Sequence, residues 1–175
     1  LYDHRMHGES DAAPATAGIK EKMDLIKVTE WLQERTQLAD QQIAWVGESW
    51  GAATVLQAGA LDKDVAFILA DSPFQDWDSA IFERAIRDYG GWVSNIAPIV
   101  MTIVDWRADI DHNQASPKEA VKAIKEPVFL IHSQSDPETA STQSVNIAEN
   151  LNPENSRFHH TNWGSKHCMD LINRP

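Results

Sequence analysis

The stretch Val46–Gly51 constrains the fold of this chain most, because it carries the pattern Gly-x-Ser-x-Gly centred on Ser49. The residues before it, Ile43–Val46, form an apolar run typical of a strand buried on both faces. The residues after it, Ala52–Ala58, are small and apolar and indicate the start of a helix. A strand, a tight turn and a helix in this order can hold a serine on a strained turn. We expect both glycines to remove side chains that would clash where strand and helix approach closely.

Such a turn predicts chemistry as well as structure. The serine hydroxyl would project from the edge of the sheet, and the first amides of the helix would point at the space where negative charge develops. The alternative is a glycine-rich turn with a surface serine, because the short pattern occurs by chance in many loops. The apolar strand and the alanine-rich helix around Ser49 favour the catalytic interpretation.

Composition sets limits on partners and compartment. The 175 residues include 42% hydrophobic residues, which predicts one soluble domain with a real core. The net charge of -11 argues against nucleic acid and anionic membrane surfaces, which need a basic face. Cys168 is the single cysteine, so no internal disulfide can form, and a reducing compartment such as the cytoplasm is favoured. The longest apolar run, Ile96–Val104, is too short to span a bilayer, and the start at Leu1 leaves any export signal or anchor open.

Further apolar runs predict the remaining strands at Val65–Ala70, Pro127–Ile131 and Ser156–Thr161. Helical periodicity covers about residues 18–37 and 141–151. Strands and helices that alternate in this way predict a three-layer α/β/α sandwich with a mostly parallel sheet and right-handed crossovers. The first ten residues suggest the end of a strand that runs into a hydrogen-bonded polar loop.

Residues 73–126 are too long for a plain connection and too apolar for disorder. We therefore predict a helical excursion that forms part of a lid over the site. A helix packed on the sheet with a long loop is the alternative. The aromatic residues from Phe74 to Trp106 suggest an apolar acyl or aromatic pocket, which a packed lid core would explain equally well.

Hydrolysis through a serine needs a nucleophile, an imidazole base and a carboxylate that orients the imidazole. Ser49, Asp136 and His167 each follow a predicted strand, in the chain order serine, acid, histidine. Because the carboxyl ends of parallel strands meet at one sheet edge, the three side chains can converge there. Asp71 also follows a strand and is the alternative acid.

Other histidines and the cysteine are weaker candidates. His159 and His160 lie within a predicted strand, and His132 is interpreted as a packed or hydrogen-bonded loop residue. Cys168 lacks the strand-turn-helix setting of a nucleophile. The spacing of His4 and His7 could suit a metal, but no third ligand is near them in the sequence, so we predict no metal site.

Taken together, the motifs resemble the α/β-hydrolase superfamily, and within it the bacterial esterases and prolyl-oligopeptidase-like proteins. The matching segments are Asp3-x-Arg5-x-His7-Gly8-x-Ser10, Gly47-Glu48-Ser49-Trp50-Gly51-Ala52-Ala53, Asp71-Ser72-Pro73-Phe74, Leu130-Ile131-His132-Ser133-x-x-Asp136 and Gly164-x-x-His167. The resemblance implies that Ser49, Asp136 and His167 are nucleophile, acid and base. It also implies that the Trp50 amide is one oxyanion donor and that no cofactor is needed.

The family has further strands before the segment that resembles residues 1–10, and the loop after its third strand supplies the second oxyanion amide. It also closes with a helix after the histidine. The chain therefore looks like a partial α/β-hydrolase catalytic domain over residues 1–175, with an exposed sheet edge that an oligomer would cover. We expect a serine hydrolase that acts on a small ester or acyl substrate. A peptidase, an acyltransferase and a non-catalytic binding domain remain the alternatives.

Overall fold

The computed structural model describes residues 1–61 and 64–171. Its elements are α1 (Glu21–Thr36), η1 (Asp40–Gln42), β1 (Trp45–Glu48), α2 (Trp50–Gly59), β2 (Ile68–Asp71), α3 (Trp77–Tyr89), η2 (Gly91–Asn95), α4 (Ala97–Ala108), η3 (His112–Gln114), α5 (Pro117–Ala120), η4 (Val121–Ala123), β3 (Val128–Ser133), α6 (Thr142–Ala148) and β4 (Arg157–Thr161). None of these described helices is long and apolar enough to cross a membrane.

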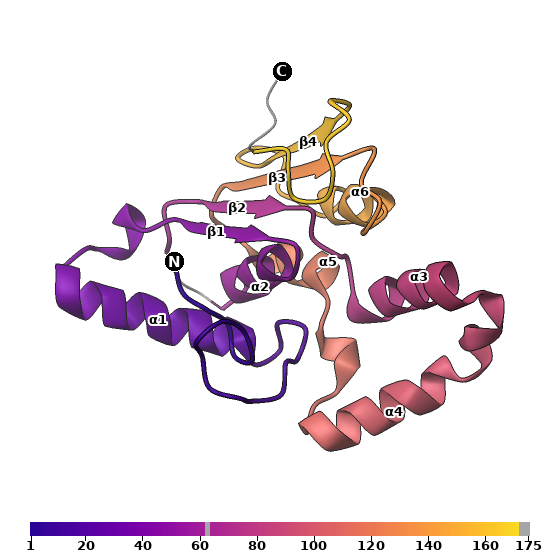
Figure 1. Cartoon of the computed structure of the whole chain (residues 1–175). Helices are drawn as coiled ribbons and strands as arrows, with labels where there is room; N and C mark the ends of the chain where they lie inside the picture. Colours follow the sequence, from indigo (N-terminus) through magenta and orange to yellow (C-terminus); the bar gives the residue numbers. More distant parts are fainter. Residues whose placement is uncertain (62–63, 172–175) are drawn as a thin grey trace.

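The described residues form a four-stranded sheet in the order β1-β2-β3-β4, and each neighbouring pair is parallel. Helices flank this sheet, so the predicted α/β class with a parallel sheet is confirmed (Figure 1). The four strands predicted between Ile43 and Thr161 are all present, and each begins one to three residues later than predicted. The element order follows from the alternation of apolar runs with amphipathic segments.

The core lies on one face of the sheet. Trp45, Ile68 and Leu130 point from the strands into a cluster that also contains side chains of α1, α2, η4 and α6. Leu56 of α2 and Ile147 of α6 are fully buried there. This packing holds α2, and with it the turn at its amino end, in a fixed position against β1 and β2.

The strand β1 differs from the prediction. Its burial alternates, and Val46 is 59% exposed, so the expectation of burial on both faces is wrong. The reason is that β1 is the first strand in the sheet order and pairs with β2 alone among the described residues. Phe129, which shares a face with Val46 two strands away, is also exposed. Coverage of the β1 edge by an oligomer stays a prediction.

The amino-terminal segment is held by its polar side chains. Within it, the Glu9 amide donates to Asp3 Oδ2 at 3.0 Å and Ser10 Oγ donates to Asp3 O at 2.7 Å, which confirms the predicted hydrogen-bonded loop. Arg5 makes a bidentate pair with Asp24 of α1, with both contacts at 2.7 Å. Residues 1–4 are not in a strand, so the predicted strand end is wrong. Such a strand needs a paired neighbour, and the described residues provide none at this position.

The excursion between β2 and β3 begins with α3, whose cap Asp76 accepts a hydrogen bond from the Ser79 amide at 2.8 Å. Figure 1 shows α3 and α4 extending away from the sheet, on the side opposite to α1. The excursion returns through α5, where Ser116 caps the helix and Pro117 takes its first position.

Candidate active site

Ser49 lies on the turn between β1 and α2 with φ 52° and ψ −114°. A side chain rarely adopts this conformation, and it costs about 1–3 kcal/mol unless the surroundings impose it. Here the Ser49 amide donates to Asp71 O on the neighbouring strand end at 2.8 Å, and Ser49 O accepts from the Ala53 amide at 3.1 Å. The turn is therefore held from both sides, with Ser49 at the carboxyl edge of the sheet.

The two glycines of the motif differ in their roles. A Cβ at Gly47 would lie 2.3 Å from the backbone oxygen of Gly51, so the close approach of β1 and α2 requires glycine there. A Cβ at Gly51 would have only His4 Nε2 nearby, at 3.9 Å. The expectation that Gly51 also relieves a clash is wrong, because this position on α2 faces open space rather than the strand.

The amide of Trp50 is the first of α2, so it has no acceptor within the helix. Within residues 1–61 and 64–171, the hydroxyl of Ser49 makes no hydrogen bond. Both groups are thus available to a ligand at the positive end of the helix dipole.

Asp136 and His167 are in direct contact. His167 Nδ1 lies 2.6 Å from Asp136 Oδ2, and the carboxylate is fully buried while the imidazole is 20% exposed. The other carboxylate oxygen accepts the amides of Glu138 at 2.8 Å and Thr139 at 3.1 Å. Since Nδ1 is engaged, Nε2 is the nitrogen of His167 left to act on a substrate or a nucleophile.

The environment keeps Asp136 ionised. Burial by itself raises the pKa of this carboxyl, but hydrogen bonds from two imidazoles and two backbone amides outweigh burial and hold the pKa well below its ordinary value. A buried anion that accepts hydrogen bonds in this way can stabilise a positive charge on the imidazole beside it.

The second imidazole on Asp136 belongs to His132, which is fully buried. His132 Nε2 lies 3.0 Å from Asp136 Oδ2 and 3.1 Å from Thr139 O, and Nδ1 lies 2.7 Å from Ser144 Oγ. Two acceptors at Nε2 mean that this nitrogen carries the proton. The sequence predicted a packed or hydrogen-bonded loop residue. The packing and hydrogen bonds are confirmed, but the loop position is wrong, since His132 lies in β3. Its contact with the acid was missed, although a histidine four residues before Asp136 was the available signal.

One contact places the loop of His167 next to the turn of Ser49, and another places the loop of Asp136 there. Cys168 Sγ lies 3.9 Å from Asp71 O, the same carbonyl that accepts the Ser49 amide. Thr139, from the loop after Asp136, lines a cavity together with Ser49. No hydrogen bond joins Ser49 Oγ to His167 in the described residues, and such bonds are often long when no substrate is bound.

Among the residues that the structure describes, the weaker candidates for acid, nucleophile and base do not make the contacts that a catalytic role would need. Asp71 is fully buried and bonds to Ser72 Oγ at 2.8 Å rather than to an imidazole, and burial raises its pKa to about 6. Burial likewise raises the pKa of the Cys168 thiol to about 12, so its reactive thiolate is disfavoured. His159 and His160 are exposed on β4, where they contact Trp163 and Phe158, respectively.

Residues with the geometry of a metal site lie on the excursion instead of beside Ser49. Ligand atoms of Asp105, Asp111 and His112 fall within 4.8 Å of one another. Both nitrogens of His112 already contact carboxylates, Asp105 at 2.7 Å and Asp78 at 3.1 Å. Hydrogen bonding that joins α3, α4 and η3 therefore explains this cluster.

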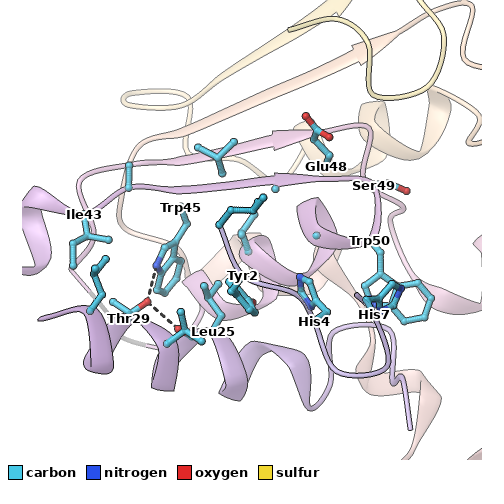
Figure 2. A pocket seen from close by; sticks show the side chains of 18 residues that line it. Tyr2, His4, His7, Leu25, Thr29, Ile43, Trp45, Glu48, Ser49 and Trp50 are labelled. Carbon is cyan, nitrogen blue, oxygen red and sulfur yellow. Dashed lines mark hydrogen bonds between the residues drawn. The ribbon is translucent and has the colours of Figure 1, made fainter. Parts of the chain in front are cut away.

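In the described part of the chain, Ser49 lines a large cavity and a small one. The large one, about 670 Å³, runs along the open edge of β1 beside α1. Figure 2 shows Trp45 pointing into it and bonded to Thr29, while the carboxylate of Glu48 points away from α1. The small one, about 150 Å³, lies between Ser49, α3 and the loop after Asp136.

The aromatic pocket predicted from Phe74 to Trp106 involves fewer residues of that segment than expected. Phe74 and Trp77 line the small cavity together with Trp50. Trp92 and Trp106 are 61% and 81% exposed and lie elsewhere on the excursion. Only the first aromatic residues of the excursion therefore reach the site, because α4 stands away from the sheet (Figure 1).

Comparisons with known proteins agree with the predicted α/β-hydrolase fold. The model of the prolyl oligopeptidase family, peptidase S9, matches residues 10–170. Protein YqkD of Bacillus subtilis (strain 168) is 36% identical over 138 residues, which cover 78% of this chain and 45% of YqkD. The chain thus spans less than half the length of this relative.

Solved structures share the fold at low identity. Esterase Pf2001 of Pyrococcus furiosus superposes with a TM-score of 0.69 at 22% identity, over 97% of this chain and 63% of the esterase. The acylaminoacyl peptidase of Pyrococcus horikoshii gives a TM-score of 0.64 at 16% identity, over 89% of this chain and 25% of the peptidase. At this identity the likeness concerns the fold alone.

Proposed function

The chain belongs to the prolyl oligopeptidase family, and from this premise we propose that it is a serine hydrolase which cleaves carboxylic esters through an acyl-enzyme on Ser49. The observation that carries the proposal is the buried contact between Asp136 and His167 at the sheet edge where Ser49 lies on a strained turn. Residues 1–175 would then form part of an α/β-hydrolase catalytic domain, with residues 73–126 as a lid-like excursion.

In this mechanism His167 Nε2 takes the proton of Ser49 as Oγ attacks the ester carbonyl. Asp136 holds the imidazole through Nδ1 and stabilises its positive charge. The Trp50 amide donates to the oxyanion, and the protonated His167 then returns the proton to the leaving alcohol. Water activated by His167 completes hydrolysis of the acyl-enzyme.

Labelling with a fluorophosphonate probe tests the proposal. We expect the folded wild-type chain to be modified at Ser49, as located by mass spectrometry, and the Ser49→Ala variant to remain unlabelled. Ser72→Ala is the matched control, since Ser72 also follows a strand end at positive φ and should leave labelling intact. Absence of labelling in the folded wild type would contradict the proposal and favour a non-catalytic binding domain.

Peptide hydrolysis on the same residues is the second candidate, because the matching family is one of peptidases. An acyltransferase would use the same acyl-enzyme with another acceptor. A panel of p-nitrophenyl esters, peptide anilides and acyl acceptors separates the three reactions. We expect esters to give the highest kcat/KM, and a preference for anilides would assign the chain to the peptidases.

A further inference from the structure

The small cavity of about 150 Å³ beside Ser49 has an aromatic wall. Ring centroids of Trp50 and Trp77 lie 4.9 Å apart at 68°, and those of Phe74 and Trp77 lie 5.5 Å apart. Edge-to-face contacts of this kind hold the rings in place. The wall is therefore a rigid apolar surface that begins at the residue after the candidate nucleophile.

One rim of the cavity joins the excursion to the loop of the candidate acid. Trp77, Ala80 and Arg84 are spaced by three and four residues, so one face of α3 lines the cavity. Arg84 Nη1 lies 3.5 Å from Glu138 Oε2 across this rim. The excursion thus limits how far a group attached to Ser49 can extend.

Gln143 supplies a buried polar group. Its side chain lines the cavity, is 1% exposed, and accepts the Gln75 amide through Oε1 at 2.8 Å. That donor fixes which end of the side-chain amide is oxygen, because only the oxygen can accept. Nε2 then has no hydrogen-bond partner within the described residues. A buried donor left without an acceptor is costly, and a ligand that brings an acceptor would explain it.

We propose that this cavity holds the acyl group of the substrate and selects short or single-ring acyl groups that carry a neutral hydrogen-bond acceptor for Gln143 Nε2. The inference rests on the proposed function, since acyl transfer to Ser49 is what places the group there. A cavity of about 150 Å³ accommodates a benzene ring, whereas a long alkyl chain exceeds it. The charged residues that line the cavity are Glu83, Arg84 and Glu138, and Arg84 is paired with Glu138. The carboxylate of Glu83 is then the charge left at the cavity and disfavours a substrate carboxylate, so the acceptor is an ether, hydroxyl or carbonyl oxygen.

An isosteric ester pair tests the role of Gln143. p-Nitrophenyl methoxyacetate and butanoate differ by one ether oxygen in place of a methylene. Gln143→Glu keeps the oxygen that accepts the Gln75 amide and removes the donor. We expect the ratio of kcat/KM for methoxyacetate over butanoate to fall about fivefold to tenfold in this variant, the size of one neutral hydrogen bond. Comparison of this ratio between the wild type and the variant cancels the intrinsic reactivity of each ester, and an unchanged ratio would overturn the assignment.

Gln143→Met removes the donor without adding charge and should lower the same ratio, which keeps the test valid if the glutamate variant does not fold. A chain-length series from acetate to dodecanoate tests the size limit. We expect kcat/KM to decline beyond about six acyl carbons, and Trp77→Ala to shift the optimum to longer chains. Trp106→Ala is the control, because it removes an exposed aromatic from the same excursion. A preference for long chains in the wild type, or a size limit on the alcohol side alone, would refute the proposal.

Ligand-observed NMR with the Ser49→Ala variant separates this inference from the proposed function. Methyl methoxyacetate should bind more tightly than methyl butanoate, and Gln143→Glu in the same background should remove the difference. If no ester is hydrolysed by the wild type while this binding preference is observed, the proposed function fails and the cavity assignment stands. Equal binding of the two esters in the Ser49→Ala variant contradicts the cavity assignment itself.

Discussion

Alanine substitutions at the two glycines of the serine turn should have opposite effects on stability. In Gly47→Ala the new Cβ would lie 2.3 Å from the Gly51 oxygen, 2.4 Å from the Gly51 carbon and 2.7 Å from the Ala52 nitrogen. All three are backbone atoms, and the three distances are far shorter than the separation of about 3.5–4.0 Å that carbon atoms in contact prefer. The clash can be relieved only if β1 and α2 move apart.

The cost follows from how those elements are packed. Both contribute buried side chains to the core, so their separation disturbs the packing between the sheet and α2. Overpacking costs about 1–3 kcal/mol, and an obstacle made of backbone places Gly47→Ala at the upper end of that range. For a domain of this size about 3 kcal/mol corresponds to a fall in Tm of roughly 6–12 °C.

Gly51→Ala is the matched control, since it adds the same methyl group four residues later. Alanine is favoured over glycine in a helix by about 1 kcal/mol, so this variant should melt at or slightly above the wild-type temperature. Thermal and urea unfolding followed by circular dichroism measure both variants. A Gly47→Ala protein that melts within about 1 °C of the wild type would refute the steric argument. Equal destabilisation by the two variants would refute the distinction between the two glycines.

Three further predictions concern the acid and its neighbours. Asp136→Asn should lower kcat by up to about 10⁴-fold with the fold retained, because the anion that orients His167 is lost; steady-state kinetics beside a circular dichroism spectrum check this, and a loss below tenfold would contradict it. His132→Leu should lower kcat by about 10–100-fold with little change in KM, since a hydrogen bond to a buried charge is removed, whereas His132→Gln keeps a donor and should retain most activity. Equal kcat values for the two variants would show that this donor has no effect. Burial raises the pKa of Asp71 from 3.8 to about 6, so this carboxyl binds a proton more readily in the folded state than in the unfolded state. The free energy of unfolding of the wild type should therefore decrease as the pH rises from about 4 to 6, by on the order of 2–3 kcal/mol. Asp71→Asn should flatten this change in urea unfolding at pH 4 and pH 7, and an unaltered pH dependence would contradict the assignment.

Much of the site follows from local features of the sequence. The apolar run before Ser49 and the small residues after it specify a strand and a helix, and only a tight turn can join them over so few residues. Asp136 and His167 each follow a β-branched or aromatic run, so a parallel sheet brings them to one edge whatever the details of packing. The contact at 2.6 Å between them is what that topology predicts.

Other features depended on elements far apart in the chain. The open face at Val46 reflects which strands lie beside β1, and an apolar run looks the same with or without a neighbour. The aromatic residues of the excursion looked equivalent in sequence, yet Trp77 faces the cavity and Trp106 faces away, because the path of α3 and α4 decides it.

The sequence by itself determined the order of strands and helices, the turn that carries Ser49 and the strand ends that carry Asp136 and His167. Those features depend on residue periodicity and on backbone conformations that few residues tolerate. The tertiary structure alone decided that the imidazoles of His132 and His167 meet at one oxygen of Asp136. It also decided that Gln143, which lines a cavity together with Ser49, has no acceptor for its amide donor within the described residues. Such contacts depend on distances between separate elements, which no local pattern encodes.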